Sequence, residues 1–184
     1  MNKSELLAYL KDIDAELKHP AMLYIYGSAA CILLDEPDRT SLDIDVAAPF
    51  SKANYSDLEQ AAEKAGIPIN PNTQTNSNHI EWIQALRLCL PKPEPENGMI
   101  LWQGQKLTIQ SAPIPELVAS KLIRYDEIDQ GDIQYLCSQA SISFSDIEKA
   151  VKKLPPAFNT DALVLENLEN LRNDLEMWRK GDIP

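Results

Sequence analysis

An alternating run of apolar and acidic residues at positions 42–46 constrains the fold of this chain most. The acids are Asp43 and Asp45, and the apolar residues that flank them are Leu42, Ile44 and Val46. Side chains of a strand point alternately to its two faces, so this period places both carboxylates on one face and the three apolar side chains on the other. The run therefore predicts a half-buried strand that presents two neighbouring acids.

A strand, a tight turn and a helix are predicted just before this run. Residues 24–26 predict a short buried strand, and residues 29–34 predict a helix that starts directly after Gly27 and Ser28. Free backbone N–H groups at such a turn favour phosphate, Gly27 allows close approach, and the Ser28 hydroxyl adds a donor. Arg39 lies in the connecting loop and is expected to reach a phosphate from there.

Paired carboxylates next to a phosphate-binding turn favour a metal site. Asp43 and Asp45 repel each other unless a cation lies between them, and Mg²⁺ prefers one or two carboxylates together with substrate phosphate oxygens. We therefore expect Asp43 and Asp45 to bind Mg²⁺ or Mn²⁺ with a nucleoside triphosphate. The alternative is an edge strand whose acids are only its solvated face.

The composition is that of a globular protein without strong attraction to nucleic acid. The chain has 184 residues, 44% of them hydrophobic, and a formal net charge of −11. Its seventeen Lys and Arg residues are scattered, so an RNA substrate gains no general electrostatic help. Three separated cysteines predict reduced core thiols, and no apolar run is long enough to span a membrane, so we expect a cytoplasmic protein with no membrane partner.

The periodicity predicts an α/β (α+β) fold, with a mixed sheet flanked by helices at residues 1–112 and a helical region at residues 113–184. Expected helices cover residues 4–18, 55–65, 117–126, 132–140, 145–154 and 161–180. Further expected strands cover residues 85–90 and a hairpin of 99–103 with 106–110, while the polar stretch 70–79 and residues 91–98 are expected to be loops. Capping boxes are expected at Asn2 with Glu5 and at Ser145 with Glu148.

A second group of charged residues lies in the helical region. Lys121 and Arg124 are expected on one face of a helix, and the acids Asp126, Asp129 and Asp132 follow. A cation beside the acid pair would neutralise charge that develops on a transferring phosphoryl group. The alternative is an ordinary amphipathic helix that exposes a Lys and an Arg among acids.

These motifs together resemble the nucleotidyltransferase superfamily related to DNA polymerase beta. Its signature is an apolar residue, Gly, Gly or Ser, and then a strand with two acids, which matches Tyr26, Gly27, Ser28, Asp43 and Asp45. The run 39–45 and the later helix with a Lys and an Arg are most similar to the bacterial AbiEii-type and DUF6036-type nucleotidyltransferases. The resemblance covers residues 22–136.

The resemblance implies a nucleotidyltransferase-like fold and transfer of a nucleoside monophosphate from an NTP to a hydroxyl of RNA, such as tRNA, or of a protein. It implies Asp43 and Asp45 as metal ligands, with Lys121 and Asp132 as further catalytic residues. Gly27, Ser28, Arg39 and Arg124 are expected to contact phosphate. Such proteins often act in bacterial toxin–antitoxin or phage-defence pairs, which implies a cognate antitoxin as a protein partner.

Many members of this superfamily carry a third acid on a later strand, and no strand predicted here carries one. Glu81 is the nearest acid, but it is interpreted as an exposed residue where a strand or helix starts, and His79 as a surface residue. This departure keeps two alternatives open. The first is a degenerate nucleotidyltransferase fold that binds a nucleotide or a protein without turnover, and the second is an interaction protein whose acidic surface meets a basic partner.

Overall fold

The computed structural model describes residues 1–71, 77–94 and 97–180, and these form two compact units. The first unit comprises residues 1–88 and 93–112, and the second comprises residues 89–92 and 113–184. The first contains a sheet with helices packed against it, and the second is helical. Each unit is described by itself.

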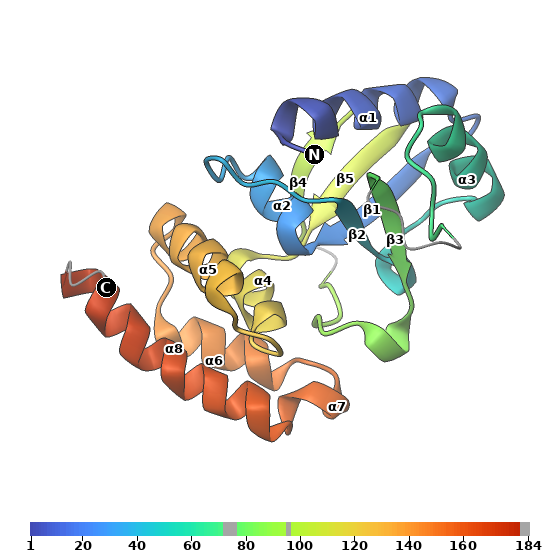
Figure 1. Cartoon of the computed structure of the whole chain (residues 1–184). Helices are drawn as coiled ribbons and strands as arrows, with labels where there is room; N and C mark the ends of the chain where they lie inside the picture. Colours follow the sequence, from blue (N-terminus) through green and yellow to red (C-terminus); the bar gives the residue numbers. More distant parts are fainter. Residues whose placement is uncertain (72–76, 95–96, 181–184) are drawn as a thin grey trace. The chain divides into compact units, whose positions relative to one another are not determined.

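A mixed five-stranded sheet forms the centre of the first unit (Figure 1). Its strands lie in the order β3-β2-β1-β5-β4. Strands β1 and β5 are parallel, as are β2 and β3, whereas β1 with β2 and β4 with β5 are antiparallel. The bounds are β1 Ala21–Tyr26, β2 Asp43–Ala47, β3 His79–Ile83, β4 Met99–Gln103 and β5 Leu107–Ser111. The expected mixed α/β class, the mixed sheet and the hairpin of β4 and β5 are confirmed.

Three α-helices accompany this sheet in the described part of the first unit. They are α1 Lys3–Glu16, α2 Gly27–Leu33 and α3 Tyr55–Lys64, and two short 3₁₀ helices are η1 Ala48–Phe50 and η2 Ala85–Arg87. Helix α1 packs against α3 and also contacts β5, while α2 packs against β1 and β2. The expected capping box at Asn2 and Glu5 is confirmed, and Gly66 has a φ of +76° just beyond the end of α3.

Asp14 fixes the hairpin of β4 and β5 to helix α1. Its carboxylate accepts hydrogen bonds from the backbone N–H groups of Gln105, Lys106 and Leu107, at 3.0, 2.7 and 2.6 Å. Burial alone raises the pKa of Asp14, but these backbone donors and the nearby charge of Lys106 outweigh it, so the pKa of Asp14 is lowered. A helix side chain thereby sets the position of a turn about ninety residues later in the chain.

The second unit consists of helices. They are α4 Ile114–Lys121, α5 Glu127–Gln139, α6 Phe144–Lys152, α7 Pro156–Asn159 and α8 Ala162–Lys180. Pro115 lies in the first turn of α4, where its missing N–H costs nothing. Helix α4 packs against α5 and α6, and its side chains Leu117, Val118 and Ala119 are fully buried there. Cys89 belongs to this unit, and burial, with the negative charge of Asp161, raises its pKa to about 12.

The expected strand at residues 85–90 is wrong. Residues 85–87 form η2, and the next strand of the chain lies earlier, at β3 His79–Ile83. The apolar run did not predict a strand correctly, because its residues are not paired in the sheet. Leu86 is 95% exposed, and Leu88 and Leu90 are buried by packing instead. The alternation His79, Ile80, Glu81 is what pairs with β2.

Three further expectations require correction. The helix expected at 117–126 ends at Lys121, because Tyr125 adopts a φ of +54° and Asp126 caps a new helix, α5. The second capping box is formed by Ser143 and Asp146, not by Ser145 and Glu148, so the N-cap of α6 lies two residues earlier than expected. Leu42 lies before β2 and is 51% exposed, so it does not share the buried face.

Parts of the two expected loops, residues 72–76 and 95–96, lie outside the described residues. None of the helices in the described ranges combines the length and apolar character that crossing a membrane requires.

Candidate metal and phosphate site

Strand β2 presents its two acids as the alternation predicts. Ile44 and Val46 are buried, whereas Asp43 and Asp45 are only half-buried. Ser41 donates a hydrogen bond from its hydroxyl to Asp43 Oδ1 at 2.6 Å, which orients that carboxylate. Both acids thus lie on the side of the strand that keeps access to solvent.

Asp45 lies directly against the turn between β1 and α2. It is the antiparallel partner of Tyr26, the last residue of β1. A Cβ added at Gly27 would stand 2.2 Å from Asp45 Oδ2, and Gly27 has a φ of +65°. Only glycine satisfies both conditions. The predicted close approach of phosphate to Gly27 stays a prediction, and the group that lies against Gly27 here is the Asp45 carboxylate.

Ser28 and Arg39 meet beside this turn. Arg39 donates a hydrogen bond from its guanidinium to Ser28 Oγ and another, at 2.6 Å, to the carbonyl of Thr40. Ser28 lies in the first turn of α2, where backbone N–H groups have no partner inside the helix. Four predicted residues, Gly27, Ser28, Arg39 and Asp45, are therefore brought together at one end of β1 and β2.

Strand β3 adds two side chains of metal-binding type to which the sequence analysis gave no role. Glu81 is the parallel partner of Asp45, and His79 is the parallel partner of Asp43. Paired residues of parallel strands point to the same face, so both side chains join the acids. The expectation that no later strand carries a third acid is wrong. The signal for it was the alternation of residues 79–81, which repeats that of 43–45.

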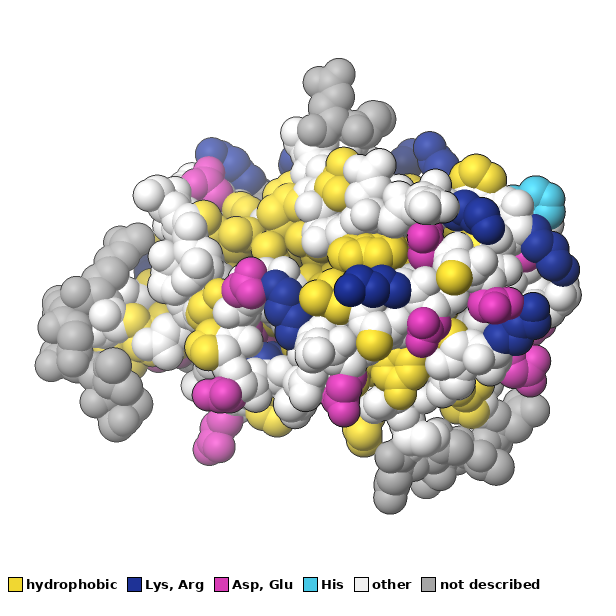
Figure 2. Space-filling view, turned by 90° about the horizontal axis from the view of Figure 1, so that it is seen from above, with side chains coloured by type: hydrophobic (Ala, Val, Ile, Leu, Met, Phe, Trp, Pro, Cys, Tyr) yellow, Lys and Arg dark blue, Asp and Glu magenta, His cyan; other side chains and the backbone are white. Residues whose placement is uncertain are grey.

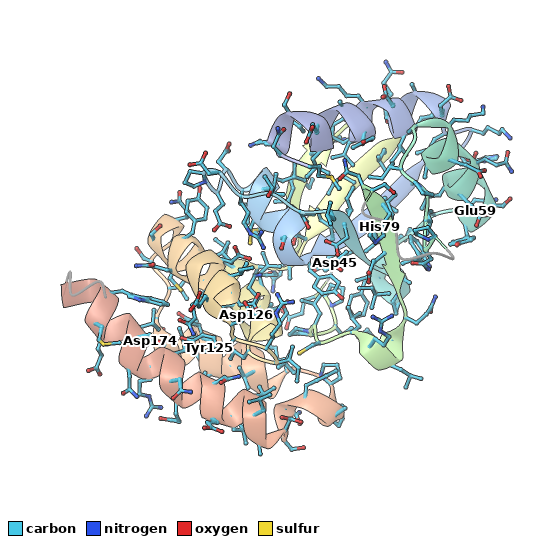
Figure 3. The ribbon with its side chains drawn as sticks, in the orientation of Figure 1. Asp45, Glu59, His79, Tyr125, Asp126 and Asp174 are labelled. Carbon is cyan, nitrogen blue, oxygen red and sulfur yellow. The ribbon has the colours of Figure 1, made fainter. Side chains whose placement is uncertain are left out.

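The resulting cluster has the spacing of a metal site. One ligand atom each from Asp43, His79 and Glu81 lie within 4.8 Å of one another. His79 Nε2 lies 3.7 Å from Glu81 Oε1, and these side chains are 16% and 34% exposed. Figure 3 labels Asp45 on β2 and His79 on the neighbouring β3. The loop expected at residues 70–79 extends one residue too far, because His79 opens β3.

Comparison with protein-family models, curated proteins and solved structures finds no match to this chain. The resemblance to nucleotidyltransferases therefore rests on the motif residues of the sequence.

The cations of the second group are held by buried acids within the helical unit. Lys121 is 5% exposed, and its Nζ lies 3.1 Å from Asp129 Oδ1 and 2.5 Å from Asp132 Oδ2. Arg124, at 62% exposure, donates two hydrogen bonds to Asp129, at 2.8 and 2.9 Å, and pairs with Asp126. Lys121 and Arg124 meet at Asp129 although the helix between them ends. Asp129 was not among the predicted site residues.

This charged group and the acid pair of β2 belong to different units. Asp43 and Asp45 lie in the first unit, whereas Lys121, Arg124 and Asp132 lie in the second. Within the second unit, the two cations pair with three acids, the buried Asp129 and Asp132 and the more exposed Asp126. Buried acids need such partners, so the group also stabilises the junction of α4 and α5.

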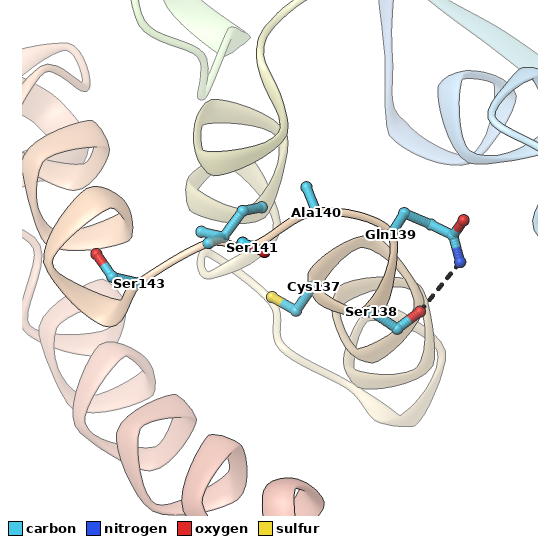
Figure 4. A pocket seen from close by; sticks show the side chains of 7 residues that line it. Cys137, Ser138, Gln139, Ala140, Ser141 and Ser143 are labelled. Atoms are coloured by element: carbon cyan, nitrogen blue, oxygen red, sulfur yellow. Dashed lines mark hydrogen bonds between the residues drawn. The ribbon is translucent and has the colours of Figure 1, made fainter.

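Two pockets of the helical unit offer fewer candidate functional groups. A pocket along residues 137–143 is lined by one thiol, three serines, a glutamine and two apolar side chains, and Gln139 donates to Ser138 Oγ there at 3.2 Å (Figure 4). A second pocket borders Tyr125, whose hydroxyl donates to Asp174 Oδ2 at 2.5 Å. Burial, then the hydrogen bond and the charge of Asp174, raise the pKa of Tyr125 far above its usual range. Neither pocket gathers a set of metal ligands from its described lining residues.

Proposed function

We propose that this protein is a metal-dependent nucleotidyltransferase that transfers a nucleoside monophosphate from an NTP to a hydroxyl of RNA or protein. One observation carries the proposal. The carboxylate of Asp45 packs against Gly27 at the start of α2, while Asp43 and Glu81 stand beside it on two neighbouring strands. Acids and a phosphate-binding turn in one place are what this reaction requires.

The donor set fits a divalent cation. Carboxylate oxygens from Asp43, Asp45 and Glu81 are hard ligands of the kind that Mg²⁺ and Mn²⁺ take, and their partial exposure leaves room for phosphate oxygens. When bound, such an ion polarises the phosphoryl group and offsets the charge of the triphosphate. Without it, the acids would repel both one another and the substrate.

The residues around the turn would bind the leaving end of the NTP. The N–H groups at Gly27 and Ser28 would donate hydrogen bonds to the terminal phosphates, and Arg39, which donates to Ser28 Oγ, would add a positive charge. In the transfer, the acceptor hydroxyl oxygen forms a bond to the α-phosphorus and the bond between the α- and β-phosphates breaks. Pyrophosphate leaves, and the hydroxyl proton passes to a carboxylate of the cluster.

Lys121, Arg124 and Asp132 stay predicted participants. Lys121 would steady the triphosphate or the transition state, Asp132 would orient Lys121 or the acceptor, and Arg124 would add a phosphate contact. The support is the 2.5 Å pair between Lys121 Nζ and Asp132 Oδ2, which fixes the ammonium group firmly. Both cations already pair with acids of their own unit. Contacts of Lys121 or Arg124 with the substrate phosphates would therefore compete with these ion pairs.

The acceptor would be recognised by local contacts more than by a broad positive field. On the face seen in Figure 2, acidic and basic side chains of the described residues are intermixed. The net charge of −11 acts against a long nucleic acid. A short RNA element such as a tRNA end, or a protein side chain, fits better. A role in a toxin–antitoxin or phage-defence pair, with a cognate antitoxin as partner, follows only from the resemblance. The degenerate fold that binds without turnover stays the second candidate, and Glu81, which stands on β3 beside Asp45, favours the active enzyme over it.

Calorimetry tests the proposal directly. The wild type and the double variant Asp43→Ala/Asp45→Ala are titrated with each of the four NTPs, with and without Mg²⁺. We expect metal-dependent binding of at least one NTP by the wild type only. An α-phosphate-labelled NTP then identifies the acceptor when label enters tRNA or protein. The proposal fails if the folded wild type binds none of the NTPs.

A further inference from the structure

The cluster at β2 and β3 contains a nitrogen ligand as well as carboxylates. His79 opens β3 and stands beside Asp43 in the parallel register, two residues before Glu81. A site built for Mg²⁺ alone uses oxygen ligands, because a small hard cation gains little from imidazole. The presence of His79 therefore bears on which ion the site takes.

The hydrogen bonding of His79 leaves one ring nitrogen available to a metal. Its Nδ1 lies 3.0 Å from the carbonyl oxygen of Ser77. A carbonyl oxygen only accepts, so Nδ1 carries the proton and, in the neutral ring, Nε2 keeps its lone pair. Metal-binding histidines typically donate their other N–H group to a backbone carbonyl or a carboxylate in this way, which fixes the tautomer and the ring.

The distances within the cluster fit one shared ion better than a direct hydrogen bond. His79 Nε2 and Glu81 Oε1 are 3.7 Å apart, beyond the roughly 2.7–3.2 Å of an N–H···O bond. Two ligands that each lie about 2.1 Å from a metal are about 3.0–4.2 Å apart, depending on the angle at the metal. The ligand atoms of Asp43, His79 and Glu81 all lie within 4.8 Å of one another, so small side-chain shifts bring them to one ion.

We propose that His79 is a metal ligand, together with Asp43 and Glu81, and that it makes this site selective for a first-row transition dication over Mg²⁺. An imidazole nitrogen strengthens binding of Mn²⁺, Co²⁺ and Zn²⁺ relative to Mg²⁺. The two carboxylates supply oxygen ligands, which suit an ion that also binds phosphate oxygens. The catalytic role of the ion rests on the proposed function, whereas its binding to His79, Asp43 and Glu81 does not.

Metal binding is measured on the full chain, with no nucleotide present. Calorimetry with Mn²⁺ and Mg²⁺ is run on the wild type, His79→Gln and His19→Gln. The chain has only these two histidines. His19 is a matched control, because its Nδ1 also lies 3.0 Å from an oxygen atom, here of Asp57, which is on α3 and not on β2 or β3. Electron spin echo spectra of bound Mn²⁺ show directly whether a nitrogen nucleus is coordinated.

We expect the wild type to bind Mn²⁺ at least about tenfold more tightly than Mg²⁺, and His79→Gln to lose about tenfold or more in Mn²⁺ affinity. Its Mg²⁺ affinity should change far less, and the nitrogen coupling should disappear. His19→Gln should keep the wild-type values. Thermal melting in EDTA shows whether both variants are folded, and if His79→Gln is not, the nitrogen coupling in wild type and His19→Gln decides.

Equal affinity of the wild type for the two ions, or bound Mn²⁺ without nitrogen coupling, overturns the inference. Its failure is separable from that of the proposed function. Mg²⁺-dependent NTP binding that is unchanged in His79→Gln would keep the transferase and remove the selective role of His79. Nitrogen-coordinated Mn²⁺ in a protein that binds no NTP would keep the metal site and remove the transferase.

Discussion

The carboxylate of Asp45 occupies the space where any side chain at position 27 would start, with Asp45 Oδ2 at 2.2 Å from a Cβ built on Gly27. This contact joins the acid strand β2 to the turn before α2. It explains why a glycine stands here in terms of both backbone angle and space, and it makes Gly27 the most direct test of the site.

Gly27→Ala should abolish metal-dependent NTP binding and lower the melting temperature. The added methyl displaces the Asp45 carboxylate, and alanine at a φ of +65° is strained by about 1–2 kcal/mol. Gly66→Ala is the matched control, because Gly66 has a φ of +76° but no atom within 4 Å of its added Cβ. It should show the strain alone, with normal binding in calorimetry. Normal NTP binding by Gly27→Ala would contradict the assignment of this turn.

Glu81→Gln should weaken the stabilisation that Mg²⁺ or Mn²⁺ gives, without destabilising the metal-free protein. Removing one of three neighbouring negative charges relieves repulsion, so the melting temperature in EDTA should stay equal or rise. Adding about 10 mM Mg²⁺ or Mn²⁺ should raise the melting temperature of this variant less than that of the wild type. Glu63→Gln, on the exposed side of α3, is the control and should respond to metal like the wild type. An unchanged metal response in Glu81→Gln would remove Glu81 from the site.

Lys121→Met should destabilise the protein by about 3–5 kcal/mol, because it leaves Asp129 and Asp132 buried without their shared cation. Lys149→Met removes an exposed lysine that pairs with Asp146 and should cost less than about 1 kcal/mol. Urea unfolding at neutral pH compares the two variants. A loss below about 1 kcal/mol for Lys121→Met would show that the buried pairs contribute little.

Asp14→Asn should lower stability at neutral pH by about 1–2 kcal/mol and flatten its dependence on pH in acid. The pKa of Asp14 is lowered in the folded state, so its contribution is fully present above the unfolded pKa of about 3.9 and is lost as the pH falls through the lower folded value. Urea unfolding between about pH 7 and pH 3 measures this difference. Asp12→Asn, on the exposed face of the same helix, is the control. If both variants follow the wild-type pH profile, the backbone donors to Asp14 do not act as described.

Local patterns in the sequence determined the strand with Asp43 and Asp45, the turn at Gly27 and Ser28, the hairpin of β4 and β5 and the capping box of α1. Each depends on neighbours within a few residues, through the period of side chains along a strand or through turn and cap chemistry. The apolar run at 85–90 failed as a strand because burial there comes from packing rather than from pairing.

Only the tertiary structure decided what stands next to these motifs. No local rule places Glu81 beside Asp45 or His79 beside Asp43, because strand register depends on the pairing of β2 with β3, more than thirty residues apart. The same holds for Asp129, which draws Lys121 and Arg124 together after their helix ends, and for Asp14, which holds a distant hairpin. Sequence alone identified the acids and the turn, since their chemistry is local, whereas the set of side chains at the candidate metal site follows from contacts that form only when the sheet assembles.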